Sequence, residues 1–392
     1  VERSRGLGDV YKRQEEMSYV YKHDNRPWLI GYSGGKDSSL LVSLVVETVL
    51  RLPEHERTKK IFIVTSDTGV ENPVVKRYMH TSSQKINEFS SRFSANIRAD
   101  IIYPDVAQSY WSLVIGLGYP TPEPPGFRWC TERLKILPMN RYTNSIIEKH
   151  GEVVLLLGVR KAESLTRRRS IVSREIEGKL LTPHSDIAKA YVYNPLTEIA
   201  NELVWEYLLK DNGVSPWGVD MKYLFSLYQG EDMGEEQSVI GQIDKDKIPV
   251  TGNSRFGCWC CTIVKVDKSL QKFIDNGSKE LEPLRLFRDW LVSIRQDPEF
   301  RDNKRRNGKV YQKANGEYGF GPFKMSARQE ILRRLLLLQK QTGFELITLD
   351  ELKMIDTLWD LEGDLSRRAL VEIYYSIFPV SYTHLRAHET SL

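Results

Sequence analysis

Short apolar runs alternate with longer amphipathic segments in the first half of the chain. Four of the runs have the length of buried strands: WLIGY (28–32), IFIVT (61–65), DIIYP (100–104) and VVLLLGV (153–159). Segments with helical periodicity lie between them, among them 38–50 and 73–93. Strands that alternate with helices are typical of a parallel sheet flanked by helices on both faces. The pattern therefore predicts an α/β fold.

The same pattern places several loops at one edge of the predicted sheet. Pro138 suits the first turn of a helix that ends at Gly151, so the run at 153–159 is the next strand. The strand-end loops then fall at Ser33, Ser66, Cys130 and Arg160. Because ligands bind at the carboxyl ends of parallel strands, we expect the binding site at this edge.

The second half of the chain is mostly helical, with its strongest segment at 326–343. We predict an α/β domain over residues 24–200 and a mainly helical C-terminal region over residues 201–378. Residues 1–23 and 379–392 show no clear periodicity, and we expect these ends to be poorly ordered.

The composition allows a packed core but does not identify a partner. The chain has 392 residues, of which 41% are hydrophobic, and a formal net charge of +4. No apolar stretch approaches the roughly 20 residues that cross a bilayer, and the beginning of the chain lacks the pattern of a signal peptide. We therefore expect a cytoplasmic protein without a membrane partner.

A glycine- and serine-rich hexamer separates the first predicted strand from the first predicted helix. Its members are Ser33, Gly34, Gly35, Lys36, Asp37 and Ser38. Backbone N–H groups at a helix N-terminus, flexible glycines and a lysine suit an anion such as a phosphate. The spacing differs from that of the phosphate loop of kinases and GTPases. The alternative is a plain turn with a polar cap.

Two further loops carry side chains that suit nucleotide binding. Asp67 and Thr68 follow the second strand, and Asp67 is either a ligand of Mg²⁺ or the N-cap of the next helix. Arg160 follows the fourth strand, where a guanidinium can neutralise a phosphoryl group. The arginines at 167–169 and the basic segment 301–313 either contact a nucleic-acid backbone or are solvated.

Three of the four cysteines, Cys258, Cys260 and Cys261, lie within four positions. Clustered thiolates bind soft metal centres, and together with Cys130 they reach the number of ligands of a [4Fe-4S] cluster. Zinc at the same thiols and a redox-active dithiol are the alternatives. Cys130 by itself could be an inert buried side chain, although the basic residues around it favour the thiolate.

The ordered set of motifs resembles one protein family. Beside the hexamer, the set contains SDTGVENP (66–73), RWCTERLK (128–135), GVRKAES (158–164), SPWG (215–218) and RFGCWCCT (255–262). In this order the motifs are similar to those of the DndC/SspD family, the ATP-pyrophosphatase subunits of bacterial DNA phosphorothioation, which are related to phosphoadenosine-phosphosulfate (PAPS) reductases. The resemblance runs from about Arg26 to about Phe378.

The resemblance implies an adenine nucleotide alpha hydrolase-like fold, also called the PP-loop ATP pyrophosphatase fold. It further implies an ATP-dependent sulfurtransferase that activates a DNA backbone phosphate, releases pyrophosphate and replaces a non-bridging oxygen with sulfur. The implied cofactors are ATP, Mg²⁺ and a [4Fe-4S] cluster. The implied partners are DNA, a cysteine desulfurase as sulfur donor, and other phosphorothioation subunits of the DndD/DndE or SspB/SspC type in antiphage defence.

The resemblance also assigns roles to residues of this chain. The hexamer would bind the ATP phosphates, with Lys36, Asp37 and Arg160 as catalytic residues. The remaining nucleotide contacts would come from Asp67, Thr68, Gly158 and Glu163.

The thiols of the family match Cys130, Cys258 and Cys261. Thr251 stands where relatives have a further cysteine, so Cys260 is the substitute candidate for the fourth cluster ligand.

Three other functions fit parts of the sequence. Reduction of phosphoadenosine phosphosulfate or adenylylsulfate would need a reactive thiol in the C-terminal tail, and no cysteine follows Cys261. Thiolation of a tRNA base would be supported by an RNA-binding module, and the sequence has none that we recognise. A non-catalytic, ATP-sensing scaffold is disfavoured because Ser33, Lys36 and Asp37 are all retained.

Overall fold

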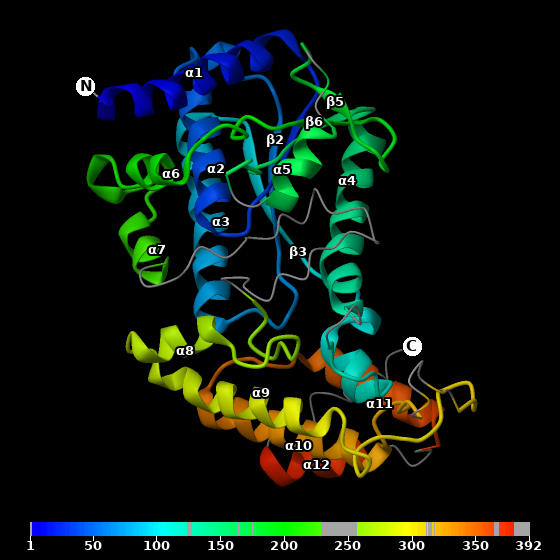
Figure 1. Cartoon of the computed structure of the whole chain (residues 1–392). Helices are drawn as coiled ribbons and strands as arrows, with labels where there is room; N and C mark the ends of the chain where they lie inside the picture. The colour runs from blue at the N-terminus through cyan, green and yellow to red at the C-terminus, as the bar shows by residue number, and fades with distance from the viewer. Residues whose placement is uncertain are drawn as a thin grey trace, which may run out of the picture. The chain divides into compact units, whose positions relative to one another are not determined.

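The computed structural model divides the chain into two compact units, each coloured along the chain in Figure 1. It describes residues 2–379 except 124–127, 163–164, 175, 177, 229–256, 311, 313–315, 317 and 364–367. The sheet unit contains Val1–Asp67, Pro73–Ile102 and Lys135–Phe256, and the helical unit contains Thr68–Asn72, Tyr103–Leu134 and Gly257–Leu392. The division therefore differs from the predicted boundary at residue 200.

The sheet unit is built on a six-stranded sheet in the order β3-β2-β1-β4-β6-β5. The strands are β1 (Trp28–Gly31), β2 (Ile61–Ser66), β3 (Ile97–Ile102), β4 (Val153–Leu156), β5 (Thr182–Pro183) and β6 (Ala190–Tyr193). All neighbouring pairs are parallel except β5 with β6. The predicted α/β fold with a parallel sheet is confirmed.

Helices cover both faces of this sheet (Figure 1). The helices of the unit are α1 (Glu2–His23), α2 (Lys36–Leu50), α3 (Pro73–Phe93), α4 (Leu137–His150), α5 (Leu165–Val172), α6 (Asn201–Leu208) and α7 (Met221–Tyr228). Trp28 and Ile30 pack with α2 on one face, while Leu29 packs with Met139 and Ile146 of α4 on the other. Successive side chains of β1 thus face opposite layers, as the pleat requires.

The strand order creates a switch point beside β1. From β1 the chain adds β2 and β3 on one side, and it returns to add β4 on the other side. At such a point the loops that follow the two central strands diverge to opposite faces and leave a crevice at their carboxyl ends. The loops after β1 and β4 are the ones predicted to hold the hexamer and Arg160.

Residues 2–23 form helix α1, which corrects the expectation of a poorly ordered N-terminus. Val10, Met17, Val20 and Tyr21 are buried in the same core as α2. The apolar positions of this segment are too few for a clear period, so packing against α2 and α6 rather than local pattern accounts for the helix. Residues 380–392, most of the other predicted end, lie outside the described residues.

The helical unit confirms the mainly helical character of the C-terminal region. Its α-helices are α8 (Lys268–Asp275), α9 (Glu282–Ile294), α10 (Met325–Thr342), α11 (Leu349–Leu361) and α12 (Ala369–Ile377). The segment 103–134 packs among them, because Trp111 Nε1 donates to Leu346 O at 2.8 Å and Trp359 Nε1 donates to Ile115 O at 2.9 Å. Across the described part of both units, no helix has the length and apolar content to span a membrane.

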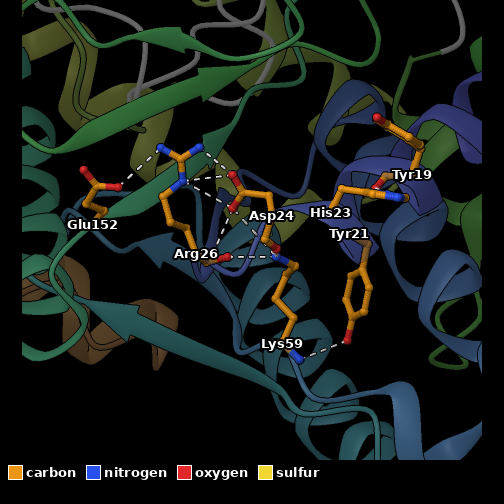
Figure 2. A network of polar contacts seen from close by, with 7 residues as sticks. All are labelled: Tyr19, Tyr21, His23, Asp24, Arg26, Lys59 and Glu152. Atoms are coloured by element: carbon orange, nitrogen blue, oxygen red, sulfur yellow. Dashed lines mark hydrogen bonds and ion pairs between the residues drawn. The ribbon is translucent and has the colours of Figure 1, made fainter.

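A buried lysine fastens the chain ahead of β1 to the start of β2 (Figure 2). The Lys59 ammonium donates to the carbonyls of Asp24 and Arg26, the latter at 3.0 Å. It also lies 5.4 Å from the Tyr21 ring centroid and 5.6 Å from that of Trp28. Burial lowers the pKa of Lys59 to about 8, although the nearby Asp24 carboxylate acts in the opposite direction.

This pKa predicts an alkaline gain in stability that depends on Lys59. Between pH 8 and 10.5 the unfolded chain, in which lysine has its ordinary pKa of about 10.5, binds more protons at this residue than the folded chain. The free energy of unfolding of the wild type should therefore rise with pH in this window relative to that of Lys59→Met. Urea unfolding at pH 7 and pH 9.5 measures this difference; parallel pH profiles for the two proteins would contradict it.

Candidate functional site

The hexamer lies in the turn between β1 and α2, where the sequence pattern predicts it. Gly34 has φ +74°, a conformation that favours glycine, and a Cβ there would lie 3.0 Å from Met79 Cγ. Ser33 Oγ and Ser38 Oγ are 3.1 Å apart, and Ser38 Oγ donates to Gly35 O at 3.0 Å. The turn thus directs the first N–H groups of α2 toward the carboxyl end of β1.

The centre of the site is the buried carboxylate of Asp37. Arg160 Nε donates to Asp37 Oδ1 at 2.6 Å, and Lys36 Nζ lies 3.0 Å from Asp37 Oδ2. Each of the three residues is at most 3% exposed. Burial acts to raise the pKa of Asp37, but the charges of Lys36 and Arg160 overcome it and lower the pKa below its ordinary value. Asp37 is therefore an ionised acceptor that fixes two cations at the switch point.

The loop after β4 presents Arg160 to this carboxylate. Arg160 Nη1 also donates to Ile199 O at 3.2 Å, and Nη2 donates to Asn201 Oδ1 at 3.1 Å. Gly158 allows the close approach, because a Cβ at this position would lie 3.2 Å from Asp37 O. The guanidinium is thus held by three groups from two segments of the sheet unit, and its orientation is set before any ligand binds.

Tyr228, at the end of α7, occupies the N-terminus of α2. Its hydroxyl accepts a hydrogen bond from the Lys36 N–H at 3.1 Å, and its ring centroid is 5.5 Å from Lys36 Nζ. The ring packs edge-on against Trp205 of α6 at 5.0 Å. The phenol oxygen therefore takes a backbone donor that would be available to an anion at a helix N-terminus.

Asp67 lies just beyond β2 and is completely buried. His80 Nε2 is 2.9 Å and Lys76 Nζ 3.4 Å from Asp67 Oδ2, and both side chains come from α3. The carboxylate is thus paired with two groups of the helix. A divalent cation at Asp67 would compete with them, so its role as a Mg²⁺ ligand stays a prediction.

The cysteine loop lies in the helical unit. Cys261 N donates to Cys258 O at 3.0 Å, so Cys258 and Cys261 stand at the two ends of a turn. Residues 70 and 71 hold the start of this turn through the hydrogen bond from Trp259 N to Val70 O, at 3.0 Å, and the bridge between Glu71 and Cys258. Thr68 Oγ1 lies 3.9 Å from Cys258 Sγ.

The four thiols differ in exposure. Cys130, Cys258 and Cys261 are half-buried, whereas Cys260 is fully buried. Burial raises the pKa of Cys260, and the neighbouring thiols of Cys258, Cys261 and Cys130 raise it further, while a hydrogen bond with Tyr110 acts against them. Burial also raises the pKa of Cys261. Cys260 differs from the other three thiols in its complete burial.

The donor set suits a cluster better than one ion. In the part of the chain that the structure describes, no three Cys, His, Asp or Glu side chains are grouped as they would be around a single metal ion. Zinc needs four donors about 2.0–2.3 Å from one point. A [4Fe-4S] cluster spreads its thiolates around a larger body, so three half-buried thiols in one neighbourhood fit its chemistry.

Other predicted residues fall outside this arrangement or outside the described residues. Glu163 and Thr251 are among the residues that the structure does not describe. Arg168 and Arg169 are exposed. Within the basic segment 301–313, Arg301 is only 5% exposed and donates to Gly321 O at 2.8 Å, so this guanidinium is buried in the helical unit.

Several residues that complete the two sites were not predicted from the sequence. His80 and Lys76 stand four positions apart, which places them on one face of α3, and this spacing is a signal that sequence alone could have provided. Tyr228, Asn201 and Tyr110 have no such signal, because their roles depend on tertiary contacts.

Large parts of the chain are similar to known proteins. Residues 27–216, slightly less than half of the chain, match the family model of the phosphoadenosine phosphosulfate reductase domain. These residues are thus similar to a PAPS reductase domain. Uncharacterized protein MJ0066 of Methanocaldococcus jannaschii is 23% identical over 213 residues, which are 54% of this chain and 38% of that protein.

Two solved structures are similar at a low level. A PAPS reductase from Candida auris in complex with phosphate has a TM-score of 0.34 and 13% identity, covering 58% of this chain and 89% of its own. The U34-tRNA thiolase NcsA from Methanococcus maripaludis, with its [4Fe-4S] cluster, has a TM-score of 0.32 and 12% identity, covering 73% and 80%. No conclusion about function follows from likenesses at this level.

The buried pair of Asp37 and Arg160 predicts a large loss of stability in Arg160→Met. Removal of one partner leaves an incompletely compensated buried carboxylate, which costs about 3–5 kcal/mol. The free energy of unfolding from urea titration measures this loss. Arg98→Met is the matched control, because Arg98 is exposed and its pair with Asp100 should contribute at most about 1 kcal/mol. Equal losses in the two variants would contradict the central position of the buried pair.

Proposed function

We propose that the protein is an ATP-dependent sulfurtransferase that modifies the DNA backbone. In this reaction a non-bridging oxygen of a DNA phosphodiester attacks the α-phosphorus of ATP, and pyrophosphate leaves. Sulfur at the oxidation level of sulfide then attacks the DNA phosphorus, and AMP leaves with the former DNA oxygen. The product is a phosphorothioate.

The observation that carries the proposal is the Asp37 carboxylate between Lys36 and Arg160, next to the N-terminus of α2. The N–H groups of the turn would receive the phosphate oxygens of ATP. Lys36 and Arg160, held in place by Asp37, would neutralise charge on the phosphates as the bond between the α- and β-phosphates breaks. Asp37 itself orients the cations and takes no proton in this scheme.

The thiols supply the second part of the proposal. Cys130, Cys258 and Cys261 would hold a [4Fe-4S] cluster, which supplies a place where sulfur can be bound before transfer. Asp67, in the loop after β2, ends the first segment of the sheet unit. The next residue in the chain is Thr68, which contacts Cys258. A cysteine desulfurase would provide the sulfur as a persulfide, and a thiol reductant would supply the two electrons that release it at the oxidation level of sulfide. The exposed Lys304, Arg305 and Lys309 are candidates for contact with DNA.

The PAPS reductase-like domain also supports a second function, the reduction of a sulfonucleotide to sulfite. That reaction would need a thiol that attacks the sulfonucleotide, and no cysteine follows Cys261 in the sequence. Release of sulfite from phosphoadenosine phosphosulfate in the presence of a reduced dithiol would favour this function over the first.

The first function predicts release of pyrophosphate and AMP from ATP in the presence of DNA. Lys36→Met should lower this rate by about 10²–10³-fold, because a preorganised charge at the transferring phosphoryl group is lost. Lys60→Met is the control: Lys60 lies just before β2, at the amino ends of the strands, and its substitution should leave the rate unchanged. ADP and phosphate as products, or an unchanged rate in Lys36→Met, would contradict the proposal.

The product on DNA is tested separately. The protein, ATP, DNA, a cysteine desulfurase with cysteine and a dithiol reductant are incubated together, and nuclease digests are analysed by mass spectrometry for phosphorothioate dinucleotides. The partner subunits named above are added in a parallel reaction. Pyrophosphate release without sulfur in DNA under both conditions would retain the ATP chemistry and remove DNA as the substrate.

The contact of Tyr228 with the Lys36 N–H predicts tighter nucleotide binding in Tyr228→Phe. The hydroxyl stabilises the ligand-free turn, and its removal leaves a buried donor that a phosphate oxygen can satisfy. The Kd for a non-hydrolysable ATP analogue should fall roughly tenfold, which corresponds to about 1.4 kcal/mol. Tyr223→Phe on the exposed side of α7 is the control, measured by isothermal titration calorimetry. Weaker binding in Tyr228→Phe would show that the hydroxyl contacts the nucleotide instead.

A further inference from the structure

The chain that follows the cysteine turn is fixed by one buried arginine of α9. Arg288 is completely buried. Its Nε donates to Cys261 O at 2.8 Å and its Nη1 to Lys265 O at 2.9 Å, while Nη2 donates to Val264 O. One guanidinium thus ties together three carbonyl groups within five residues, and one of them belongs to a cysteine.

Neighbouring contacts fix the same segment from other directions. Thr262 Oγ1 donates to Pro122 O at 2.5 Å, and Arg295 Nη1 donates to Thr262 O. Asp267 caps α8 by accepting from Leu270 N at 2.9 Å. The cysteine turn is therefore held at Cys258 and Trp259 by residues 70 and 71. After Cys261 it is held by α9, so its thiols have little freedom to move.

Arg288 is within electrostatic reach of Cys261 and of the half-buried carboxylate of Asp267. Most of its hydrogen bonds go to neutral carbonyl groups, and the carboxylate among its described partners is that of Asp289, at 2.7 Å, whose side chain is 43% exposed. Water screens an exposed carboxylate more than it screens a buried guanidinium. At Cys261 the positive charge of Arg288 opposes the negative charge of Asp267, so removal of the guanidinium charge alone would make the local potential more negative.

We propose that Arg288 is a positioning residue of the thiolate site, with two effects on an iron–sulfur cluster held there. Its guanidinium fixes the carbonyl groups of Cys261, Val264 and Lys265, so that Cys258 and Cys261 are presented together as ligands. Its positive charge favours the reduced cluster, which carries one more negative charge than the oxidised cluster, and so raises the reduction potential. This inference rests on the proposed [4Fe-4S] cluster.

Two substitutions separate the effects. Arg288→Lys keeps the charge but cannot bind three carbonyl groups in a fork, and Arg288→Gln also removes the charge. Arg285→Lys is the matched control on the same helix, because Arg285 is paired at the surface with Glu282 and Asp289. The full-length proteins are purified without oxygen and reconstituted with ferrous iron and sulfide, and circular dichroism checks their folding.

Iron and acid-labile sulfide per chain measure the positioning effect. The wild type and Arg285→Lys should bind about four iron atoms per chain, as a [4Fe-4S] cluster requires, and Arg288→Lys less than half of this. A redox titration followed by electron paramagnetic resonance measures the charge effect on the clusters that form. Arg288→Gln should favour the oxidised cluster by about tenfold, a shift of about 59 mV to lower potential, whereas Arg288→Lys should titrate like the wild type.

The outcomes distinguish this inference from the proposed function. A wild type that binds no cluster would remove the proposed cofactor. If the wild type and Arg288→Lys both bind a full complement of iron, the positioning effect alone is overturned. It is also overturned if Arg285→Lys loses as much iron as Arg288→Lys. A wild-type potential in Arg288→Gln would overturn the charge effect. If Arg288→Gln does not fold, the loading of folded Arg288→Lys decides the inference.

Discussion

The site depends on the burial of the Asp37 carboxylate. An ionised carboxylate that is only 3% exposed is costly unless charged donors surround it, and Lys36 and Arg160 are those donors. Arg160 belongs to the loop after β4, whereas Asp37 begins the helix after β1, so the ion pair joins the loops on the two sides of the switch point. The same interaction fixes the backbone around Gly158 and leaves the N-terminus of α2 as the natural place for an anion.

A second constraint is the way the chain divides between the two units. Residues 68–72 and 103–134 follow β2 and β3, yet they belong to the helical unit. There Val70 and Glu71 hold the start of the cysteine turn. The peptide bond between Asp67 and Thr68 therefore joins the loop after β2 to the segment that contacts Cys258.

Local pattern predicted much of the sheet unit. The period of residues 73–93 gave the bounds of α3, and Pro138 with Gly151 marked α4, because these signals act within one or two turns. The hexamer was found because it combines glycines with a strand-to-helix turn. By contrast, β6 is a short strand that forms by pairing with β4 and β5, and β3 begins three residues earlier than its apolar run suggested. The pairing of Arg160 with Asp37 and the grip of Arg288 on the cysteine turn depend on residues more than 20 positions apart, and no local signal encodes them.

The most direct measurement of the central claim is a crystal structure of the protein with bound pyrophosphate. The account predicts that the phosphate oxygens accept hydrogen bonds from the N–H groups of Gly34 to Lys36, with Arg160 and Asp37 still paired. Pyrophosphate bound away from this turn, or a turn whose N–H groups remain occupied by protein atoms, would contradict it.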